Sequence, residues 1–228
     1  MRLPCHWAAQ LRQEETNDTI ISFNYDRVLE TLVSENPDLH FKTGGDCEPL
    51  PFVTDVLKLH GSVDWRWTEH TTLEIQENEP YFALNANDNE LAIATPGPRK
   101  QSTVTDMFEP LWLLAEQQLQ EAHAIVFLGY RFPPTDAQAR QRILRAVRRG
   151  SAERDVEFHI VLGPDTNSPD VSRLAGLLEA TRRNPGGARS LGRLGRSVIH
   201  RHAMYAEDFL SVYDAKRFAQ HYKSDSPT

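Results

Sequence analysis

Thr19-Ile-Ile-Ser-Phe-Asn-Tyr-Asp-Arg-Val-Leu-Glu30 is the stretch that decides the fold of this chain. The residues before Asn24 are apolar and β-branched, which is typical of a buried strand, whereas apolar residues recur at helical spacing from Val28 to Val33. Asn24 and Asp26 lie in the break between the two patterns. In an open α/β sheet such a break marks the carboxyl end of a strand, where ligands bind. We therefore expect the rest of the chain to supply partners for these two residues.

The composition fits one globular domain over residues 1–228. The chain is 39% hydrophobic and 25% charged, so it can bury a substantial core. No apolar run approaches the roughly 20 residues of a membrane helix, and residues 1–7 lack the apolar segment of a signal peptide. We expect a cytoplasmic protein without membrane contact.

Cysteine content and charge exclude several classes. Cys5 and Cys47 are the only cysteines, so one chain builds neither a disulfide framework nor a four-cysteine zinc site. The net charge of -7 argues against a general nucleic-acid-binding surface, and we expect no direct nucleic-acid binding.

Two more strand ends carry polar residues. A short strand at Val56–Leu59 runs into His60-Gly-Ser-Val-Asp-Trp65, and a continuously apolar strand at Ala124–Leu128 runs into Gly129-Tyr-Arg-Phe-Pro-Pro-Thr-Asp136. The second strand has the composition of a parallel strand covered on both faces. With the first break, three loops are expected to converge at one edge of a sheet.

Strands and helices alternate through the rest of the chain. The other expected helices are 105–122, 136–149, 168–181 and 207–222, and the other expected strands are 156–162 and 197–201. We predict a connecting loop at 36–51, a hairpin or irregular insertion that forms a lid at 66–95, a flexible loop at 183–196 and a frayed tail at 223–228. This alternation predicts an α/β fold with a Rossmann-like, doubly wound and mainly parallel sheet.

Three motifs together carry a family resemblance. Ser-Phe-Asn-Tyr-Asp-Arg-Val-Leu-Glu, Leu-Lys-Leu-His-Gly-Ser-Val-Asp-Trp and Leu-Gly-Tyr-Arg-Phe-Pro-Pro-Thr-Asp occur in this order between Thr19 and Asp136. They resemble the sirtuin-like (silent-information-regulator-type) NAD-consuming domain of bacterial antiphage defence proteins. The missing cysteines favour the zinc-free branch over the protein deacylases, so no zinc or other metal is expected.

The resemblance implies that NAD is the substrate, with its nicotinamide-ribose bond between the catalytic residues Asn24 and His60. Cleavage of an N-glycosidic bond passes through an oxocarbenium-like sugar, so the site must hold the ribose and orient a water molecule. The amide of Asn24 can orient that water. His60, neutral near pH 7, can accept a proton from the water or from a ribose hydroxyl.

The same resemblance implies a set of NAD-binding residues: Tyr25, Asp26, Gly61, Gly129, Tyr130 and Arg131. Asp26 is expected to bond the nicotinamide amide or to stabilise the cationic sugar, and Tyr25 to form a wall. Gly129 allows close approach of the backbone to the ribose or phosphate. Arg131 replaces a serine that is common in relatives, and either contacts a phosphate or points to solvent.

One departure from the family is large. The opening strand with its glycine-rich phosphate loop is missing, since the first glycine in the chain is Gly44. In a Rossmann-type order that strand is central, and each backbone group left unpaired there costs roughly 1–3 kcal/mol. We expect an N-terminally truncated product, or a homo-oligomer, partner chain or domain that supplies the strand.

Structural alternatives exist for each candidate residue. Asn24 could cap the following helix, Asp26 could be a first-turn residue favoured by the helix dipole, and His60 could be a turn histidine bonded to backbone. His200 and His202 resemble a metal tract, but the sequence nominates no third ligand for them, and solvated side chains are the simpler interpretation.

Three functional hypotheses result. The first is an NAD hydrolase domain that releases nicotinamide and ADP-ribose during antiphage defence, with the activity belonging to the full-length parent. The second is a truncated, non-catalytic nucleotide-binding or assembly module. The third, an NAD-dependent protein deacylase, is disfavoured by the absent zinc cysteines.

Overall fold

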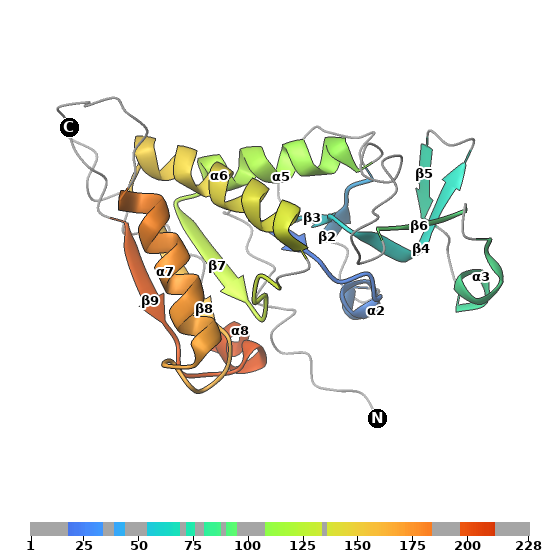
Figure 1. The fold of residues 1–228 in the computed structure, drawn as a ribbon. Helices are drawn as coiled ribbons and strands as arrows, with labels where there is room; N and C mark the ends of the chain where they lie inside the picture. The colour runs from blue at the N-terminus through green and yellow to red at the C-terminus, as the bar shows by residue number, and fades with distance from the viewer. Residues whose placement is uncertain are drawn as a thin grey trace. The chain divides into compact units, whose positions relative to one another are not determined.

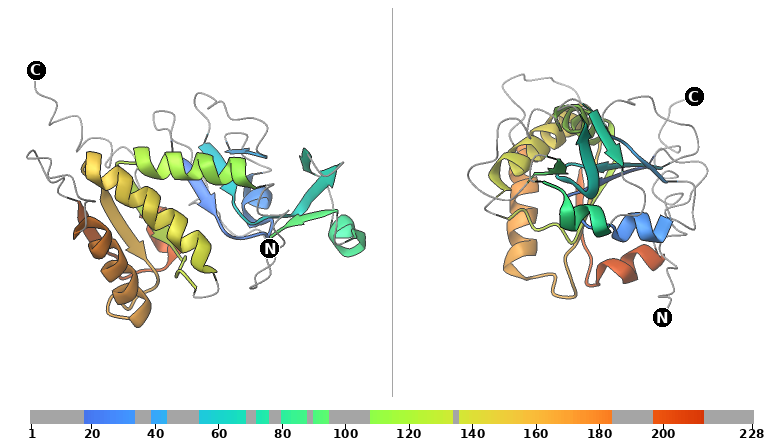
Figure 2. Two further views of the ribbon diagram at one scale, coloured as in Figure 1. Left: turned by 45° about the horizontal axis from the view of Figure 1, so that its top comes forward. Right: turned by 90° about the vertical axis from the view of Figure 1, so that its right-hand side faces the viewer.

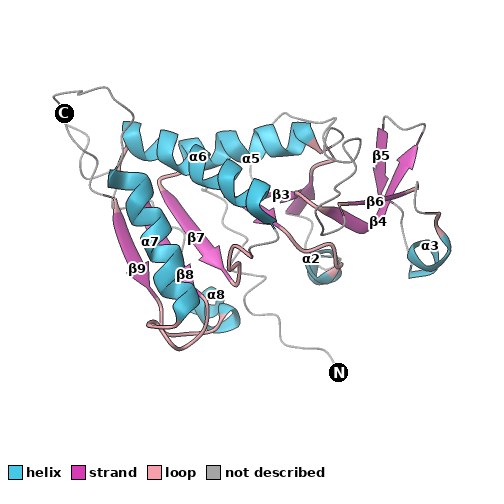
Figure 3. Cartoon of the chain, in the orientation of Figure 1, coloured by secondary structure: helices cyan, strands magenta, loops and turns pink. Residues whose placement is uncertain are grey.

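The computed structural model describes residues 18–33, 39–43, 54–68, 72–75, 80–87, 90–94, 108–133, 136–183 and 197–212. The chain divides into two compact units, residues 1–115 and 116–228, each with its own sheet and core (Figure 1). Parallel strands and helices occur in both units, as Figure 3 shows by colour, and this confirms the predicted mixed α/β class. No helix in the described ranges is long and apolar enough to cross a membrane.

The first unit contains a parallel sheet in the order β1-β3-β2. Its strands are β1 (Thr19–Ser22), β2 (Leu39–Phe41) and β3 (Thr54–Lys58), and helix α2 (Val28–Val33) follows β1. Ile21 pairs with Leu57 and Ser22 with Lys58, so β1 and β3 end side by side. The loops after these two strands therefore start at the same edge of the sheet.

An antiparallel sheet in the order β5-β4-β6 continues directly from β3. It consists of β4 (Gly61–Thr68), β5 (Thr72–Ile75) and β6 (Leu91–Ile93), with helix α3 (Pro80–Asn85) between β5 and β6. Trp65 and Trp67 are buried and pack on the ring of Phe108, at centroid distances of 6.4 and 5.4 Å. Burial of each of these side chains contributes roughly 1.5–3 kcal/mol, so they hold β4 in place.

Several predictions for the first unit need correction. The region 36–51 is not only a loop, because Leu39–Phe41 forms β2 against β3. The polar break at His60 is a two-residue turn, since β4 already begins at Gly61 and pairs with β6. The segment 66–95 contains β5, α3 and β6 among its described residues, and the β4–β5 hairpin fits the predicted hairpin. The pairings of β2 with β3 and of β4 with β6 join residues that lie far apart in the chain, which local periodicity does not reveal.

The second unit contains the parallel sheet β7-β8-β9, formed by β7 (Ala124–Leu128), β8 (Glu157–Val161) and β9 (Val198–Arg201). Helices α6 (Ala137–Glu153) and α7 (Pro169–Arg183) lie along it, and α8 (Ala206–Val212) follows β9. The right-hand view of Figure 2 shows α7 and α8 on opposite sides of this sheet. Helix α5 (Glu109–Glu121) contains the boundary between the two units.

Helices α6 and α7 match the predicted ones closely, whereas α8 covers only the start of the helix predicted at 207–222, and residues 213–222 lie outside the described ranges. The predicted cap of α7 is confirmed, because the backbone N–H of Val171 donates to Ser168 Oγ at 3.4 Å and Pro169 occupies the first helical position. Helix α6 carries apolar residues at helical spacing, of which Ile143 and Val147 are buried and Leu144 is half-buried. The expected loop 183–196 beyond Arg183, and the tail 223–228, lie outside the described residues.

Strand β7 is parallel to β8, as its apolar run predicts, but its burial is uneven. The apolar run of β7 predicts cover on both faces, yet its residues alternate between half-buried and buried, with Ile125 and Phe127 on the buried side. Among the described strands, β7 pairs only with β8, so it is an edge of its sheet. An apolar run therefore does not by itself identify a central strand.

Candidate functional site

The loop after β1 and the turn after β3 are joined by backbone hydrogen bonds. The N–H of Leu59 donates to Ser22 O at 3.0 Å, and the N–H of Val63 donates to Tyr25 O at 3.0 Å. These bonds extend the pairing of β1 and β3 beyond the ends of the strands. They place residues 23–27 against the start of β4, and we call this region the 22–27/58–64 corner.

Lys58 is the central side chain of the corner. It is 1% exposed, and its Nζ donates to Asp26 O at 2.5 Å, Glu30 Oε1 at 2.6 Å and Ser62 Oγ at 2.7 Å. A buried ammonium group is tolerated only where it is paired and hydrogen-bonded, and Lys58 uses its three donors in this way. The lysine thus ties the loop, helix α2 and strand β4 to one point.

A second charged pair closes the corner. Arg27 Nε lies 3.3 Å from Asp64 Oδ2, and Asp64 is fully buried on β4. Sequence reasoning did not assign roles to Lys58, Glu30, Arg27 or Asp64. The available signal was a lysine inside an otherwise apolar strand, since a charge in that position needs a buried partner.

His60 occupies the turn between β3 and β4. Its ring meets the ring of Phe23 edge-on, with centroids 5.3 Å apart, and Phe23 in turn lies 6.1 Å from the ring of Trp112. The carbonyl oxygen of His60 accepts a hydrogen bond from the N–H of Ala94 at 2.9 Å. The half-buried imidazole therefore has an apolar wall on the side of the β1 loop.

Asn24, Tyr25 and Asp26 are exposed at the rim of the corner. Asp26 Oδ1 accepts a hydrogen bond from the N–H of Val28 at 3.1 Å and so begins helix α2. Among the hydrogen bonds of the described residues, the side-chain bond to the start of α2 therefore comes from Asp26 rather than from Asn24. The backbone N–H of Asn24 donates to Ser22 Oγ at 3.2 Å, which shapes the loop before it.

Gly61 has a structural reason to be glycine. Its φ is +78°, and a Cβ atom at this position would lie 1.9 Å from the carbonyl oxygen of Ala92 on β6. The close approach of β4 and β6 therefore requires glycine here. The role of Gly61 in NAD binding stays a prediction, in addition to this structural requirement.

The third predicted loop belongs to the second unit. Gly129 has a φ of +70°, a Cβ atom at this position would meet no neighbouring atom within 4 Å, and the Gly129 N–H donates to Val161 O at 3.0 Å. Tyr130 Oη donates to Asp136 Oδ2 at 3.1 Å, and burial, with the Asp136 carboxylate beside it, raises the pKa of Tyr130. This tyrosine is therefore neutral at physiological pH and can donate a hydrogen bond.

Arg131 is held by helix α7 rather than pointing only to solvent. Its guanidinium lies 3.3 Å from Asp170 Oδ2, and its carbonyl oxygen accepts a hydrogen bond from Arg173 at 2.6 Å. The pair is largely exposed, so its net contribution to stability is small. The structure thus brings together the predicted residues of the first unit, and separately those of the second unit.

A family model for SIR2-like domains matches residues 18–182, which is most of the chain and includes all three loops. The chain belongs to the SIR2-like family. No curated protein matches the chain as a relative. SIR2-like domains use NAD, so membership gives this chain an NAD-related function in general terms.

The residues of the SIR2-like corner are of a kind that suits a nucleotide sugar. Asn24 and Asp26 offer an amide and a carboxylate at the carboxyl end of parallel strands, which is where α/β sheets bind nucleotides. His60 adds an imidazole beside the apolar ring of Phe23. Hydrogen-bonding groups next to an aromatic wall fit a ribose with a flat base attached.

Proposed function

We propose that this SIR2-like chain is an NAD glycohydrolase domain that converts NAD and water into nicotinamide and ADP-ribose. The observation that carries the proposal is the corner around Lys58, which joins the Asn24 loop to the His60 turn through buried polar contacts. A network of that kind holds neighbouring side chains in a defined geometry, as catalysis requires.

The proposed reaction breaks the bond between the nicotinamide nitrogen and the ribose carbon. The bonding electrons leave with neutral nicotinamide, and a water oxygen bonds to the ribose carbon from the opposite face. Asn24 orients this water through its amide, and His60 accepts the proton that the water loses. Asp26 contributes a negative charge near the cationic sugar, while its Oδ1 also holds the start of α2.

The other predicted NAD-binding residues keep, each within its own unit, the roles that the family resemblance implies. Tyr25 forms a wall, Gly129 permits approach of the backbone, and Tyr130 and Arg131 line the same loop. We place the protein in the branch of the family without a four-cysteine zinc site, in the bacterial cytoplasm and in antiphage defence. The presence of only Cys5 and Cys47 supports this choice over a protein deacylase.

A partner strand is part of this proposal. Among the described strands, β1 and β7 each pair on one side only. A parallel strand from a second copy of the chain, a partner chain or a further domain would satisfy the open backbone groups of such an edge, as in β-augmentation. Size determination by light scattering tests the homo-oligomer, since a monomer at all concentrations contradicts it.

A non-catalytic nucleotide-binding or assembly module is the second candidate. It is favoured by Gly61, which the fold needs irrespective of any ligand. Under this hypothesis NAD binds without turnover. Titration calorimetry with NAD, run beside the activity assay, separates binding from cleavage.

The test measures nicotinamide release from NAD by chromatography. We expect Asn24→Ala and His60→Ala to lose at least about 100-fold in rate, in line with the removal of a general base. His40→Ala is the matched control, because His40 lies on β2 and pairs with Asp55 away from the corner. Equal rates in wild type, Asn24→Ala and His60→Ala contradict the catalytic assignment. NAD binding without release by the wild type supports the second candidate.

A further inference from the structure

Four polar side chains gather on one face of β8 and β9. The strand register places His159 directly opposite His200. Glu157 precedes His159 by two positions and His202 follows His200 by two, so all four point to the same face. The N–H of His202 donates to Ile160 O at 2.9 Å, so the ladder continues to this residue.

Three of these residues have ligand atoms close enough together to bind one metal ion. One ligand atom each from Glu157, His159 and His200 lies within 4.8 Å of the other two. His159 Nε2 is 3.5 Å from Glu157 Oε2. Two ligands on a tetrahedral zinc ion with bonds of about 2.1 Å lie about 3.4 Å apart, so this pair already has the required separation.

His200 can complete the set if its ring rotates. Its ring stacks on that of His159, with centroids 4.7 Å apart and planes at 15°. A metal ion lies close to the plane of each imidazole that binds it, so the His200 ring has to tilt out of the stack. His200 is exposed, and solvent gives it room to do so, while His159 is only 4% exposed. The cluster therefore has one rigid ligand and one adaptable ligand.

His202 supplies an outer contact to the rigid ligand. Its Nε2 lies 3.0 Å from His159 Nδ1, and its ring packs edge-on against Phe209 of α8 at 4.9 Å. When His159 Nδ1 donates to His202, the lone pair of His159 Nε2 faces the Glu157 carboxylate. Two acceptors then point at one another, and a cation between them satisfies both.

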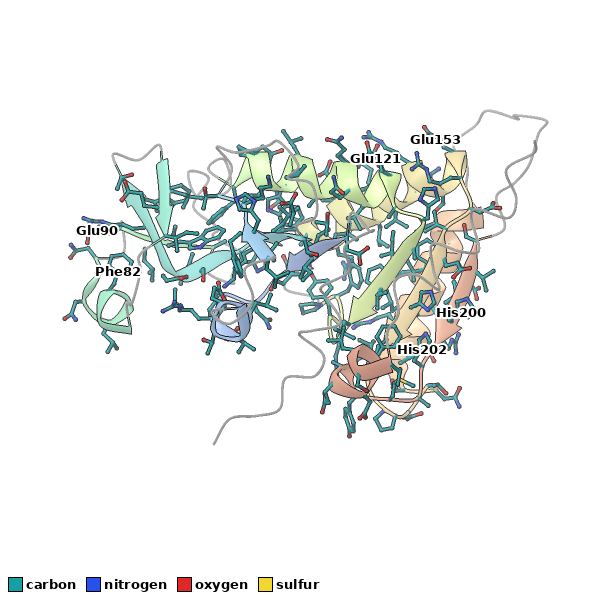
Figure 4. The ribbon with its side chains drawn as sticks, turned by 180° about the vertical axis from the view of Figure 1, so that it is seen from behind. Phe82, Glu90, Glu121, Glu153, His200 and His202 are labelled. Atoms are coloured by element: carbon teal, nitrogen blue, oxygen red, sulfur yellow. The ribbon has the colours of Figure 1, made fainter. Side chains whose placement is uncertain are left out.

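We propose that Glu157, His159 and His200 bind one divalent transition-metal cation, with zinc as the best fit, and that His202 orients His159. Two imidazoles and a carboxylate match the preferences of zinc, whereas magnesium and calcium prefer oxygen ligands alone. The site cross-links β8 and β9. Figure 4 shows His200 and His202 beside the strands of this sheet.

This site differs from the zinc site whose absence was expected from the cysteine content. The sequence led us to expect no other metal either, since it nominated no third ligand for His200 and His202. The proposed site departs from that expectation, and its donors are two histidines and a carboxylate. Glu157 and His159 lie next to His200 and His202 only because β8 pairs with β9. Parallel pairing of strands separated by a helix brings such distant residues together.

The test uses the complete, tag-free chain after removal of metal with a chelator. Zinc affinity is measured by competition with a chromophoric chelator, and cobalt(II) absorption reports the coordination geometry. We expect one zinc ion per chain, and binding at least about 100-fold weaker in Glu157→Gln and His200→Ala. His202→Ala, as the outer contact, is expected to weaken binding by about 10–100-fold.

Two controls make the result decisive. His123→Ala removes an exposed histidine outside the cluster and should bind zinc as the wild type does. Circular dichroism checks that His200→Ala is folded, which its exposed position favours. The proposal is overturned if the wild type binds no zinc saturably, if His200→Ala binds as tightly as wild type, or if magnesium binds as tightly as zinc.

Discussion

The Lys58 network of the first unit and the histidine cluster of the second unit are both polar groups on neighbouring strands. Lys58 brings a positive charge to acceptors, and its Nζ has three of them within 2.7 Å. The histidine cluster brings imidazoles and the Glu157 carboxylate together, and all of these can offer lone pairs. In the first group the three donors of Lys58 all have acceptors, whereas the second group is suited to receiving a cation.

The Lys58 network and the histidine cluster illustrate two different roles of polar residues near a core. In the Lys58 network, opposite charges pair within the protein. The network therefore holds the Asn24 loop and the start of β4 in position. A cluster of acceptors gains most when an external cation joins it. Burial lowers the pKa of His159 to about 4, with His200 and His202 as further causes, so protons compete poorly for this imidazole.

The largest predicted effect follows from removal of the Lys58 charge. Lys58→Met leaves the Glu30 carboxylate without its buried cation, and we expect a loss of about 3–5 kcal/mol in the free energy of unfolding. Urea unfolding followed by tryptophan fluorescence measures this loss in the first unit. Trp65, Trp67 and Trp112 are buried there, and residues 116–228 contain no tryptophan.

The control for this substitution is Arg148→Met, which changes an exposed residue of α6 and should alter stability by less than about 0.5 kcal/mol. A loss below about 1 kcal/mol in Lys58→Met would show that the network does not hold the corner.

A smaller effect compares the two left-handed glycines. Gly61→Ala combines a backbone cost of about 1–2 kcal/mol with a clash against Ala92, for a total loss of about 2–5 kcal/mol. Gly129→Ala meets no neighbouring atom and should cost only about 1–2 kcal/mol. Thermal unfolding by calorimetry measures both. Similar losses in the two variants would contradict the tighter packing of the corner.

A last effect concerns zinc and the second unit. Zinc at 100 times its dissociation constant should stabilise the native state by about 2.7 kcal/mol. Hydrogen exchange by mass spectrometry should show slower exchange in β8 and β9, with no change in β3 and β4. Equal slowing in all four strands, or none, would argue against a local site on the histidine face.

Sequence reasoning located most of the elements that surround the candidate site. The break after Ser22, the strand before Gly129 and the cap at Ser168 were all visible, because periodicity and capping depend on residues a few positions apart. The weak alternation between Trp67 and Ile93 indicated a hairpin or irregular insertion, but not the pairing of β4 with β6. Among the described strands β7 pairs only with β8, and apolar content does not state how many neighbours a strand has.

The sequence by itself determined the family, the mixed α/β class and the three loops that carry Asn24, His60 and Gly129. Only the tertiary structure decided which side chains support them. Lys58 meets Glu30 across 28 positions of the chain, and His159 meets His202 across 43. Contacts of that range depend on which strands pair and in which register, and a local sequence pattern does not contain that information.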